Sequence, residues 1–295
     1  MNKSFTLIEI LVVIVIIGIL SGFIIVGMAG VSDKANIAKG QAFASSLKNS
    51  LMLNLVSEWR LDETGVDTVV KDSWGANTGA WTGPAGAYTS PSWRTASECV
   101  SGGCLAFDGT DDYVNAGTGA NLNITGDQLT LGAWVKVISW SGSETYAIVA
   151  ENYQANTGGY FIERDNANNY FFLGLWTAAG FNATIPTEVL SENKWYYLVG
   201  VFNSTYTKFY INGALKKTES FAATTIASSA NPFVMGGKGG ALNNLNGILD
   251  DVRVYNMALP TSQIRQNYYS GLNRLLAGQS IDSREYIKGL ALEEN

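Results

Sequence analysis

The sequence predicts an α+β chain, in which a long N-terminal helix is joined to an all-β sandwich that ends in short C-terminal helices. Three observations support this prediction. The uncharged apolar run Ile10–Val31 is followed by helical spacing of apolar residues as far as Trp59. After Arg60, turn residues separate short aromatic and β-branched runs, which is the pattern of strands. Over Ser262–Asn295 the spacing becomes helical again.

The composition limits the classes of function. The 295 residues suffice for one large all-β domain or two smaller ones, and a hydrophobic content of 46% can form a folded core. The formal net charge is -6 and Lys and Arg are not clustered, which argues against binding to nucleic acid or to anionic membranes. The chain contains no histidine, which excludes Ser-His-Asp and Cys-His catalysis and His-ligated metal sites. A bound metal would be a hard cation held by oxygen ligands.

The apolar run Ile10–Val31 would span about 33 Å as a helix, close to the apolar thickness of a bilayer, about 30 Å. A cleaved secretory signal would have a shorter apolar core and a small-residue cleavage site, which does not follow clearly here. A simple membrane anchor fits the length but leaves Glu9 unexplained, because a carboxylate at the start of such a run is costly to bury without a partner. The partners that the nearby sequence offers are Lys3 and an amino terminus.

The residues around Glu9, KSFTLIE, resemble the prepilin signature of type IV pilins and of the pseudopilins of type II secretion. The resemblance implies that a prepilin peptidase cuts between Ser4 and Phe5, and that the new amino group of Phe5 is N-methylated. It also implies that Glu9 pairs with the amino group of Phe5 in a neighbouring subunit, which would set the register of a filament. Lys3 would hold this end in the cytoplasm. Ser4 departs from the family, in which glycine usually precedes the cut.

The resemblance and the helical spacing together define the predicted domains. Residues 1–4 are the leader, and residues 5–57 form one long helix that leaves the membrane and offers an apolar stripe to a globular head. The head occupies residues 58–269. Residues 270–295 form a helical tail, which either packs on the head or contacts the next subunit.

The two cysteines, Cys99 and Cys104, are five positions apart in ECVSGGCLAF, and the two glycines between them would let a small loop close into a disulfide. Such a bond implies an oxidising compartment outside the cytoplasm. The alternative is two separate buried thiols.

The strand pattern predicts a sandwich or jelly roll, because no helices lie between the strands. The Asn-Gly pair in INGA indicates a tight hairpin. Strands are predicted near residues 104–108, 112–115, 129–138, 145–151, 159–163, 169–176, 194–202, 207–211, 214–218, 232–236 and 246–255.

Four stretches occur in order and resemble the concanavalin A-like jelly roll of the laminin-G-like family, from about Glu58 to Tyr269. They are LAFDGTDDYVNAG, LTLGAWVKV, KWYYLVGVF with KFYING, and GILDDVRVYNMALPTSQI. This fold hosts lectins, adhesins, enzyme accessory modules and inert spacers, so it says little about function.

The jelly-roll resemblance implies one structural calcium ion (Ca2+). Its ligands would be Asp72, a backbone oxygen near Asn77, and Asp250, because calcium prefers carboxylate and carbonyl oxygens. The alternative is that these residues only cap turns. The acids of FDGTDDY are expected to form a hairpin turn rather than bind metal; they are Asp108, Asp111 and Asp112.

The head is not expected to be an enzyme. Glycoside hydrolases need two placed carboxylates, and EWRLDETG at 58–65 lacks the alternating acids of the jelly-roll hydrolases. Glycan binding through exposed aromatic rings is an alternative role, and the tryptophans that could line loops are Trp74, Trp81, Trp93, Trp140 and Trp176. By contrast, Trp134 and Trp195 lie in strand motifs and are predicted to be core.

The sequence therefore predicts a structural subunit of a type IV pilus-like extracellular filament, polymerised through its N-terminal helix. The alternatives are a minor pilin or adhesin whose head binds a glycan or a protein, and a type II secretion pseudopilin. The expected partners are further copies of the chain in a helical homopolymer, the prepilin peptidase and the assembly machinery; nucleic acid is not expected. The chain would span the inner (cytoplasmic) membrane once before assembly and then join a cell-surface filament.

Overall fold

The computed structural model describes residues 53–64, 68–83, 92–140, 146–154, 157–165, 168–220, 225–237 and 243–291. The chain divides after Leu53 into two units, and the described residues belong almost entirely to the second. Ser4, Phe5, Glu9 and the apolar run lie outside the described residues. Within the described ranges, no helix is both long and apolar enough to cross a membrane.

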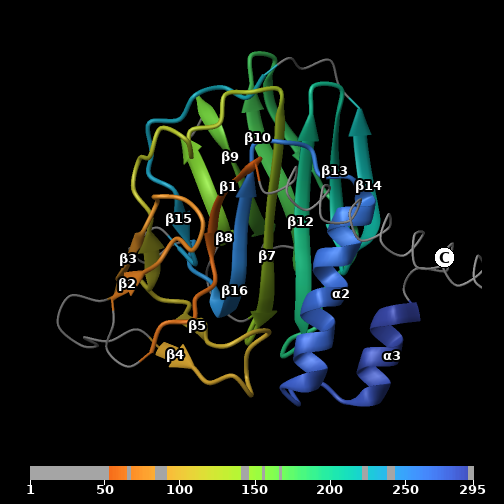
Figure 1. Cartoon of the computed structure of the whole chain (residues 1–295). Coiled ribbons are helices and arrows are strands. Elements are labelled where there is room, and N and C mark those ends of the chain that lie inside the picture. Colours follow the sequence, from red (N-terminus) through yellow and green to blue (C-terminus); the bar gives the residue numbers. More distant parts are fainter. Residues whose placement is uncertain are drawn as a thin grey trace, which may run out of the picture. The chain divides into compact units, whose positions relative to one another are not determined.

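Two antiparallel sheets, called A and B here, pack face to face (Figure 1). The strands of sheet A are β1 (Leu55–Trp59), β4 (Ser92–Arg94), β5 (Cys104–Asp108), β7 (Gln128–Val137), β12 (Trp195–Asn203), β13 (Tyr206–Ile211), β14 (Ala214–Ser220) and β16 (Asn246–Tyr255). The strands of sheet B are β2 (Val69–Val70), β3 (Gly79–Thr82), β6 (Tyr113–Asn115), β8 (Tyr146–Gln154), β9 (Gly158–Asp165), β10 (Tyr170–Thr177), β11 (Gly180–Thr184) and β15 (Val234–Met235).

The order in sheet A is β14-β13-β12-β7-β16-β5-β4, with β1 also paired to β16, and the order in sheet B is β11-β10-β9-β8-β15-β6-β3-β2. Strands that are distant in sequence therefore lie side by side. One consequence is that the end of β5 and the start of β16 lie next to each other, because Asp108 pairs with Asn246. The turn that follows β5 therefore lies beside the start of β16.

The core lies between the two sheets and follows the two-residue period of the strands. In β10, Phe171, Leu173 and Leu175 are fully buried in the core, and the paired strand β9 contributes Tyr160 and Ile162. Full burial of each such side chain stabilises the fold by about 1.5–3 kcal/mol. The alternating apolar positions thus explain why these runs form the inner faces of a sandwich.

The strands predicted from the sequence are confirmed, with small shifts at their ends. One assignment was wrong: Leu55–Trp59 belongs to β1, although the helical spacing had extended the long helix through it. The cause is tertiary, because Glu58 and Trp59 pair with Arg253 and Val252 of β16. The short strands β2, β3, β4 and β11 were not predicted. Strands of two to five residues are too short to show a clear alternation of apolar and polar residues.

The helical end of the chain forms α2 (Thr261–Ala277) and α3 (Ser283–Ala291), and α2 crosses the outer face of sheet A (Figure 1). The ring of Tyr268 stacks on Trp134 of β7, with centroids 5.7 Å apart. Gly271 is buried directly against the same tryptophan. Of the two alternatives left open for the tail, packing on the head is therefore confirmed for α2.

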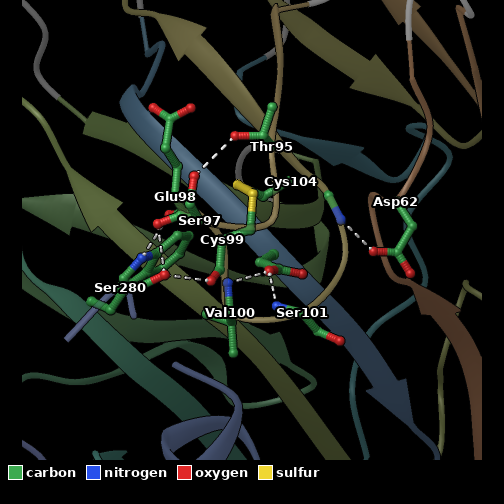
Figure 2. Close-up of a disulfide and its surroundings, with 12 residues drawn as sticks. Asp62, Thr95, Ser97, Glu98, Cys99, Val100, Ser101, Cys104 and Ser280 are labelled. Carbon is green, nitrogen blue, oxygen red and sulfur yellow. Dashed lines mark hydrogen bonds between the residues drawn. A yellow bond between two sulfur atoms is a disulfide. The ribbon is translucent and has the colours of Figure 1, made fainter. Parts of the chain in front are cut away.

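The predicted disulfide between Cys99 and Cys104 is present, with an S–S distance of 2.05 Å (Figure 2). It closes the loop between β4 and β5, and both cysteines are buried. Two acids hold the loop through backbone N–H groups: Gly103 donates to Asp62 Oδ1 at 2.8 Å, and the loop also bonds to Asp250.

Candidate functional site

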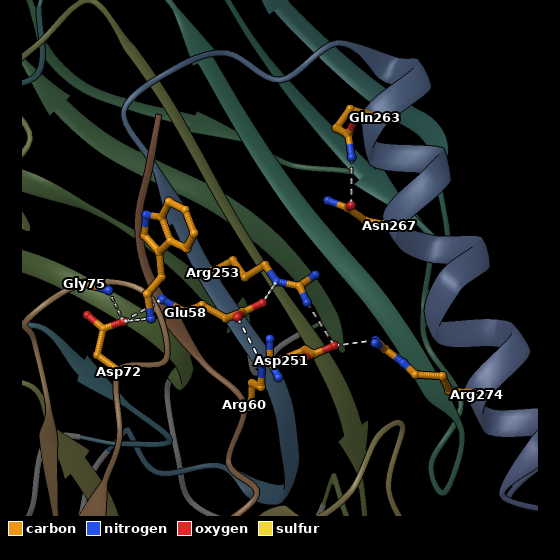
Figure 3. Close-up of polar contacts among 10 residues, drawn as sticks. Glu58, Arg60, Asp72, Gly75, Asp251, Arg253, Gln263, Asn267 and Arg274 are labelled. Carbon is orange, nitrogen blue, oxygen red and sulfur yellow. Dashed lines mark hydrogen bonds and ion pairs between the residues drawn. The ribbon is translucent and has the colours of Figure 1, made fainter. Parts of the chain in front are cut away.

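Asp72, the first predicted calcium ligand, is occupied by backbone hydrogen bonds (Figure 3). Its carboxylate oxygens accept four N–H groups at 2.8–3.1 Å, those of Glu58, Trp74, Gly75 and Asn77. Burial opposes ionisation of Asp72, but these hydrogen bonds outweigh it, so its pKa lies below the usual value. Asp72 therefore organises the loop before β3.

The other two predicted ligands also have structural partners. The backbone oxygen of Asn77 accepts the indole N–H of Trp59 at 2.8 Å. Asp250 Oδ2 accepts the N–H groups of Val100 and Ser101 in the disulfide loop, at 2.8 and 3.0 Å. In this structure the three residues hold loops, which is the alternative that the sequence had left open, and calcium binding by Asp72, Asn77 and Asp250 stays a prediction.

Asp250 is fully buried, and its Oδ1 atom makes no hydrogen bond within the described part of the chain. Burial, together with the neighbouring charges of Asp251 and Asp62, raises the pKa of Asp250 well above its usual value. The charged form of this carboxyl is therefore poorly compensated by the protein groups around it.

A buried charge network joins β1, β16 and α2 (Figure 3). Arg253 donates to Glu58 Oε1 at 2.7 Å and lies 3.3 Å from Asp251, which also accepts from Arg274 of α2. Asp251 lies at a bulge of β16 with a φ of 48°. Because the two acids and Arg253 are mostly buried, the network positions α2 on sheet A and offers solvent little reactive surface.

The turn between β5 and β6 holds three carboxylates, whose nearest oxygens lie within 4.8 Å of one another. Asp108 Oδ1 accepts the N–H of Thr110 at 2.7 Å, and Asp112 Oδ2 accepts the N–H of Asp108 at 3.2 Å, so these acids do form a turn. It is not the predicted hairpin, because β5 pairs within sheet A and β6 within sheet B, and the turn connects the two sheets. Among the described residues, Asp108, Asp111 and Asp112 form the acidic group that could hold a metal ion.

The three acids of this turn repel one another. Burial of Asp112, followed by the charges of Asp108 and Asp111, raises its pKa to about 6. The turn therefore changes its charge near neutral pH, and a bound cation would relieve the repulsion.

A polar cleft of about 210 Å³ adjoins this turn. It is formed where the β5–β6 turn, the end of β7, β9 and the start of β16 meet. Its lining residues carry carboxylate, hydroxyl, amide and guanidinium groups; they are Asp108, Gly109, Thr110, Ser139, Arg164, Asn244 and Asn246. Arg164 is only 5% exposed, donates to Asn169 Oδ1 at 2.6 Å and lies 4.5 Å from the ring centroid of Trp140.

The division of the tryptophans into buried and exposed residues differs in part from the prediction. Trp134 and Trp195 are buried, as predicted, but Trp81 is also a core residue, and Trp93 and Trp140 pack against the core. Trp74 remains 45% exposed. Trp176 is half-buried beside Phe181, an exposed aromatic residue that the sequence analysis did not single out.

The cleft was not predicted from the sequence. Its acid, Asp108, was noticed only as a turn residue, and Asn246 and Arg164 carry no local signal of binding. These three residues meet through the register of β5 with β16 and through the packing of sheet B on sheet A. The Asn-rich stretch NNLN, residues 243–246, which runs into the start of β16, was the one hint available.

Comparison with known families agrees with this architecture. A family model described as the concanavalin A-like lectin/glucanases superfamily matches residues 108–265, more than half of the chain. The chain belongs to this superfamily. A second model, the prokaryotic N-terminal methylation motif, matches residues 1–25. No curated protein sequence matches the chain.

Solved structures share the fold at low sequence identity. The binding domain of botulinum neurotoxin serotype D is 15% identical with a TM-score of 0.56, covering 76% of this chain and 52% of its own. Domain 4 of the extracellular arabinanase of Geobacillus stearothermophilus, solved in complex with arabinotriose, is 17% identical with a TM-score of 0.55, covering 72% and 97%. Trypanosoma rangeli sialidase is 18% identical with a TM-score of 0.50, covering 72% and 32%.

The chain spans about half the length of the neurotoxin binding domains that it matches. At these identities the likeness shows the fold alone. The superfamily and the methylation motif are not themselves enzymatic signatures, although a sialidase and a domain of an arabinanase share the fold.

Proposed function

We propose that the chain is a structural subunit of a type IV pilus-like extracellular filament, polymerised through a helix over residues 5–57. The observation that carries this proposal is the methylation motif over residues 1–25, together with the uncharged run that continues to Val31. A peptidase would cut between Ser4 and Phe5, and Glu9 would pair with the amino group of Phe5 in a neighbouring subunit. A carboxylate among apolar helices is tolerable only when paired, so this contact would favour one register.

The head fits export and display on a filament. Its disulfide, Cys99–Cys104, is suited to an oxidising compartment. Its core lies within residues 59–254, so a separate N-terminal segment can serve assembly. Before assembly the chain would span the inner membrane once, and its partners would be the prepilin peptidase, the assembly machinery and further copies of itself.

The experiment is to shear surface filaments from the source cells and identify the N-terminal peptide by mass spectrometry. An abundant peptide that begins with N-methyl-Phe5 is expected. Replacement Glu9→Ala should abolish filaments while the melting temperature of the head stays unchanged. The matched control Glu219→Ala removes an exposed carboxylate whose ion pair with Lys217 contributes little, and should leave filament yield unchanged. Normal filaments from the Glu9→Ala strain would refute the proposal.

A second candidate is a minor pilin or adhesin, in which the head binds a glycan or a protein. The polar cleft beside the acidic turn favours it, because a purely structural head needs no such cleft. Abundance separates the two: an adhesin would be a trace component of filaments built from another subunit. The methylation motif also fits a pseudopilin, and loss of enzyme secretion in a deletion strain would identify that role.

A further inference from the structure

We propose that the polar cleft between the β5–β6 turn and the start of β16 binds adjacent hydroxyl groups of a neutral saccharide. The inference rests on the second candidate function, that the head binds a ligand, and is independent of filament assembly. It names the site and the chemical class of the ligand.

The cleft is built on fixed backbone. Asp108 and Asn246 are a cross-strand pair of β5 and β16, so their side chains belong to one site by register. The backbone oxygen of Asn246 accepts the N–H of Ile138 at 3.0 Å. The buried Asn244 donates its amide to the backbone oxygen of Thr110. Three chain segments are thus tied together, and a ligand would meet a site that needs little reordering.

Gly109 shows how closely the turn approaches β16. It has a φ of +83°, and a Cβ atom at this position would lie 2.8 Å from Asn246 Cβ. The glycine therefore lets the turn lie directly against Asn246. Asp108 and Asn246, opposite each other in β5 and β16, both line the cleft.

Polar groups in the cleft are left without protein partners. Asp108 uses Oδ1 for the turn, but its Oδ2 makes no hydrogen bond in the part of the chain that the structure describes. Within the described residues, the hydroxyl of Thr110 and the side-chain amide of Asn246 likewise make no hydrogen bond to the protein. A carboxylate only accepts, an amide both donates and accepts, and a hydroxyl does either. Adjacent sugar hydroxyls offer the complementary donors and acceptors.

The size and the charge of the cleft limit the kind of saccharide that it could bind. A volume of about 210 Å³ is below the roughly 300–1,000 Å³ of sites for drug-sized ligands, and so suits one ring of a longer chain. The lining is polar, which disfavours an apolar ligand. Three carboxylates lie at this end, whereas Arg164 is already engaged by Asn169 and Trp140. The resulting negative potential disfavours sialylated or uronic saccharides.

The test uses the full-length chain in a zwitterionic detergent without a sugar headgroup. It would be applied to an array of neutral and acidic oligosaccharides that includes arabinotriose. The dissociation constant for the tightest neutral oligosaccharide would then be measured by calorimetry. Asp108→Asn keeps the acceptor for Thr110 N–H but replaces the free oxygen, and should weaken binding about tenfold or more. Asn246→Ala should weaken it similarly, whereas the exposed control Asp127→Asn should not change it.

Three results would overturn the inference. The first is that the protein binds no neutral saccharide on the array, and the second is that it binds acidic saccharides alone. The third is an unchanged affinity for the saccharide in both cleft variants, which would place the binding site elsewhere on the head. Melting temperatures would show that each variant is folded. Because the assay uses unassembled chains, its failure leaves the filament proposal intact, and loss of filaments in the Glu9→Ala strain does not affect it.

Discussion

Replacement of Gly271 by alanine tests how closely α2 approaches sheet A. Helix propensity alone predicts that alanine stabilises the interior of a helix by about 1 kcal/mol relative to glycine. The tertiary structure predicts the opposite sign. A Cβ atom on Gly271 would lie 2.3 Å from Cζ2 and 2.6 Å from Cε2 of Trp134.

Trp134 has little freedom to move away. It is 1% exposed and lies between Tyr197 and Tyr268, with ring centroids 5.3 and 5.7 Å from its own. Overpacking a filled core costs about 1–3 kcal/mol, and such a confined ring favours the upper end. Subtracting the gain in helix propensity leaves a destabilisation of about 2 kcal/mol, or about 4–8 °C in melting temperature for a domain of this size.

The assay is urea unfolding followed by tryptophan fluorescence, with Ser270→Ala as the control. Ser270 is the exposed neighbour in the same helix, so alanine there should be neutral or slightly stabilising. A Gly271→Ala variant as stable as the wild type, or more stable, would refute the close contact between α2 and Trp134.

Three further predictions concern the head. Replacing Arg253 by methionine removes the buried partner of Glu58 and one of the two partners of Asp251, and should cost about 3–5 kcal/mol in urea unfolding, whereas Lys217→Met at an exposed pair should cost less than about 1 kcal/mol. The pKa of Asp112 in the folded protein, about 6, exceeds the ordinary 3.8, so ionisation of Asp112 lowers the stability of the fold as pH rises from about 4 to about 6. Asp112→Asn should therefore raise the melting temperature above pH 6 but not below pH 4. Identical plots of melting temperature against pH for the variant and the wild type would contradict this. Replacing both Cys99 and Cys104 by alanine opens a loop with a sequence separation of 5 and should lower the unfolding free energy by about 2 kcal/mol; an unchanged urea midpoint would show that the bond does not constrain the unfolded chain.

Local pattern predicted much of the head. The runs LTLGAWVKV and KWYYLVGVF became β7 and β12 because alternation and β-branched residues suit a half-buried pleated surface. The disulfide was predictable because the two cysteines lie five positions apart across two glycines. The methylation motif is equally local, since it lies within residues 1–25.

Contacts between residues that are distant along the chain could not be predicted from local sequence patterns. Leu55–Trp59 continued a helical pattern, yet pairing with β16 made it a strand. The roles of Asp72 and Asp250 in holding loops were also not fixed by local pattern: Asp72 accepts backbone N–H groups from its own loop and from Glu58, and Asp250 Oδ2 accepts those of the disulfide loop.

By itself the sequence determined the N-terminal methylation motif, the sandwich class and the loop that the disulfide closes, since each depends on residues that are neighbours along the chain. The tertiary structure alone decided that α2 covers Trp134, that the predicted calcium ligands hold loops, and that Asp108, Asn246 and Arg164 share one cleft. These depend on strand register and on competition for hydrogen bonds, which are settled only when strands and loops from different parts of the chain pack together.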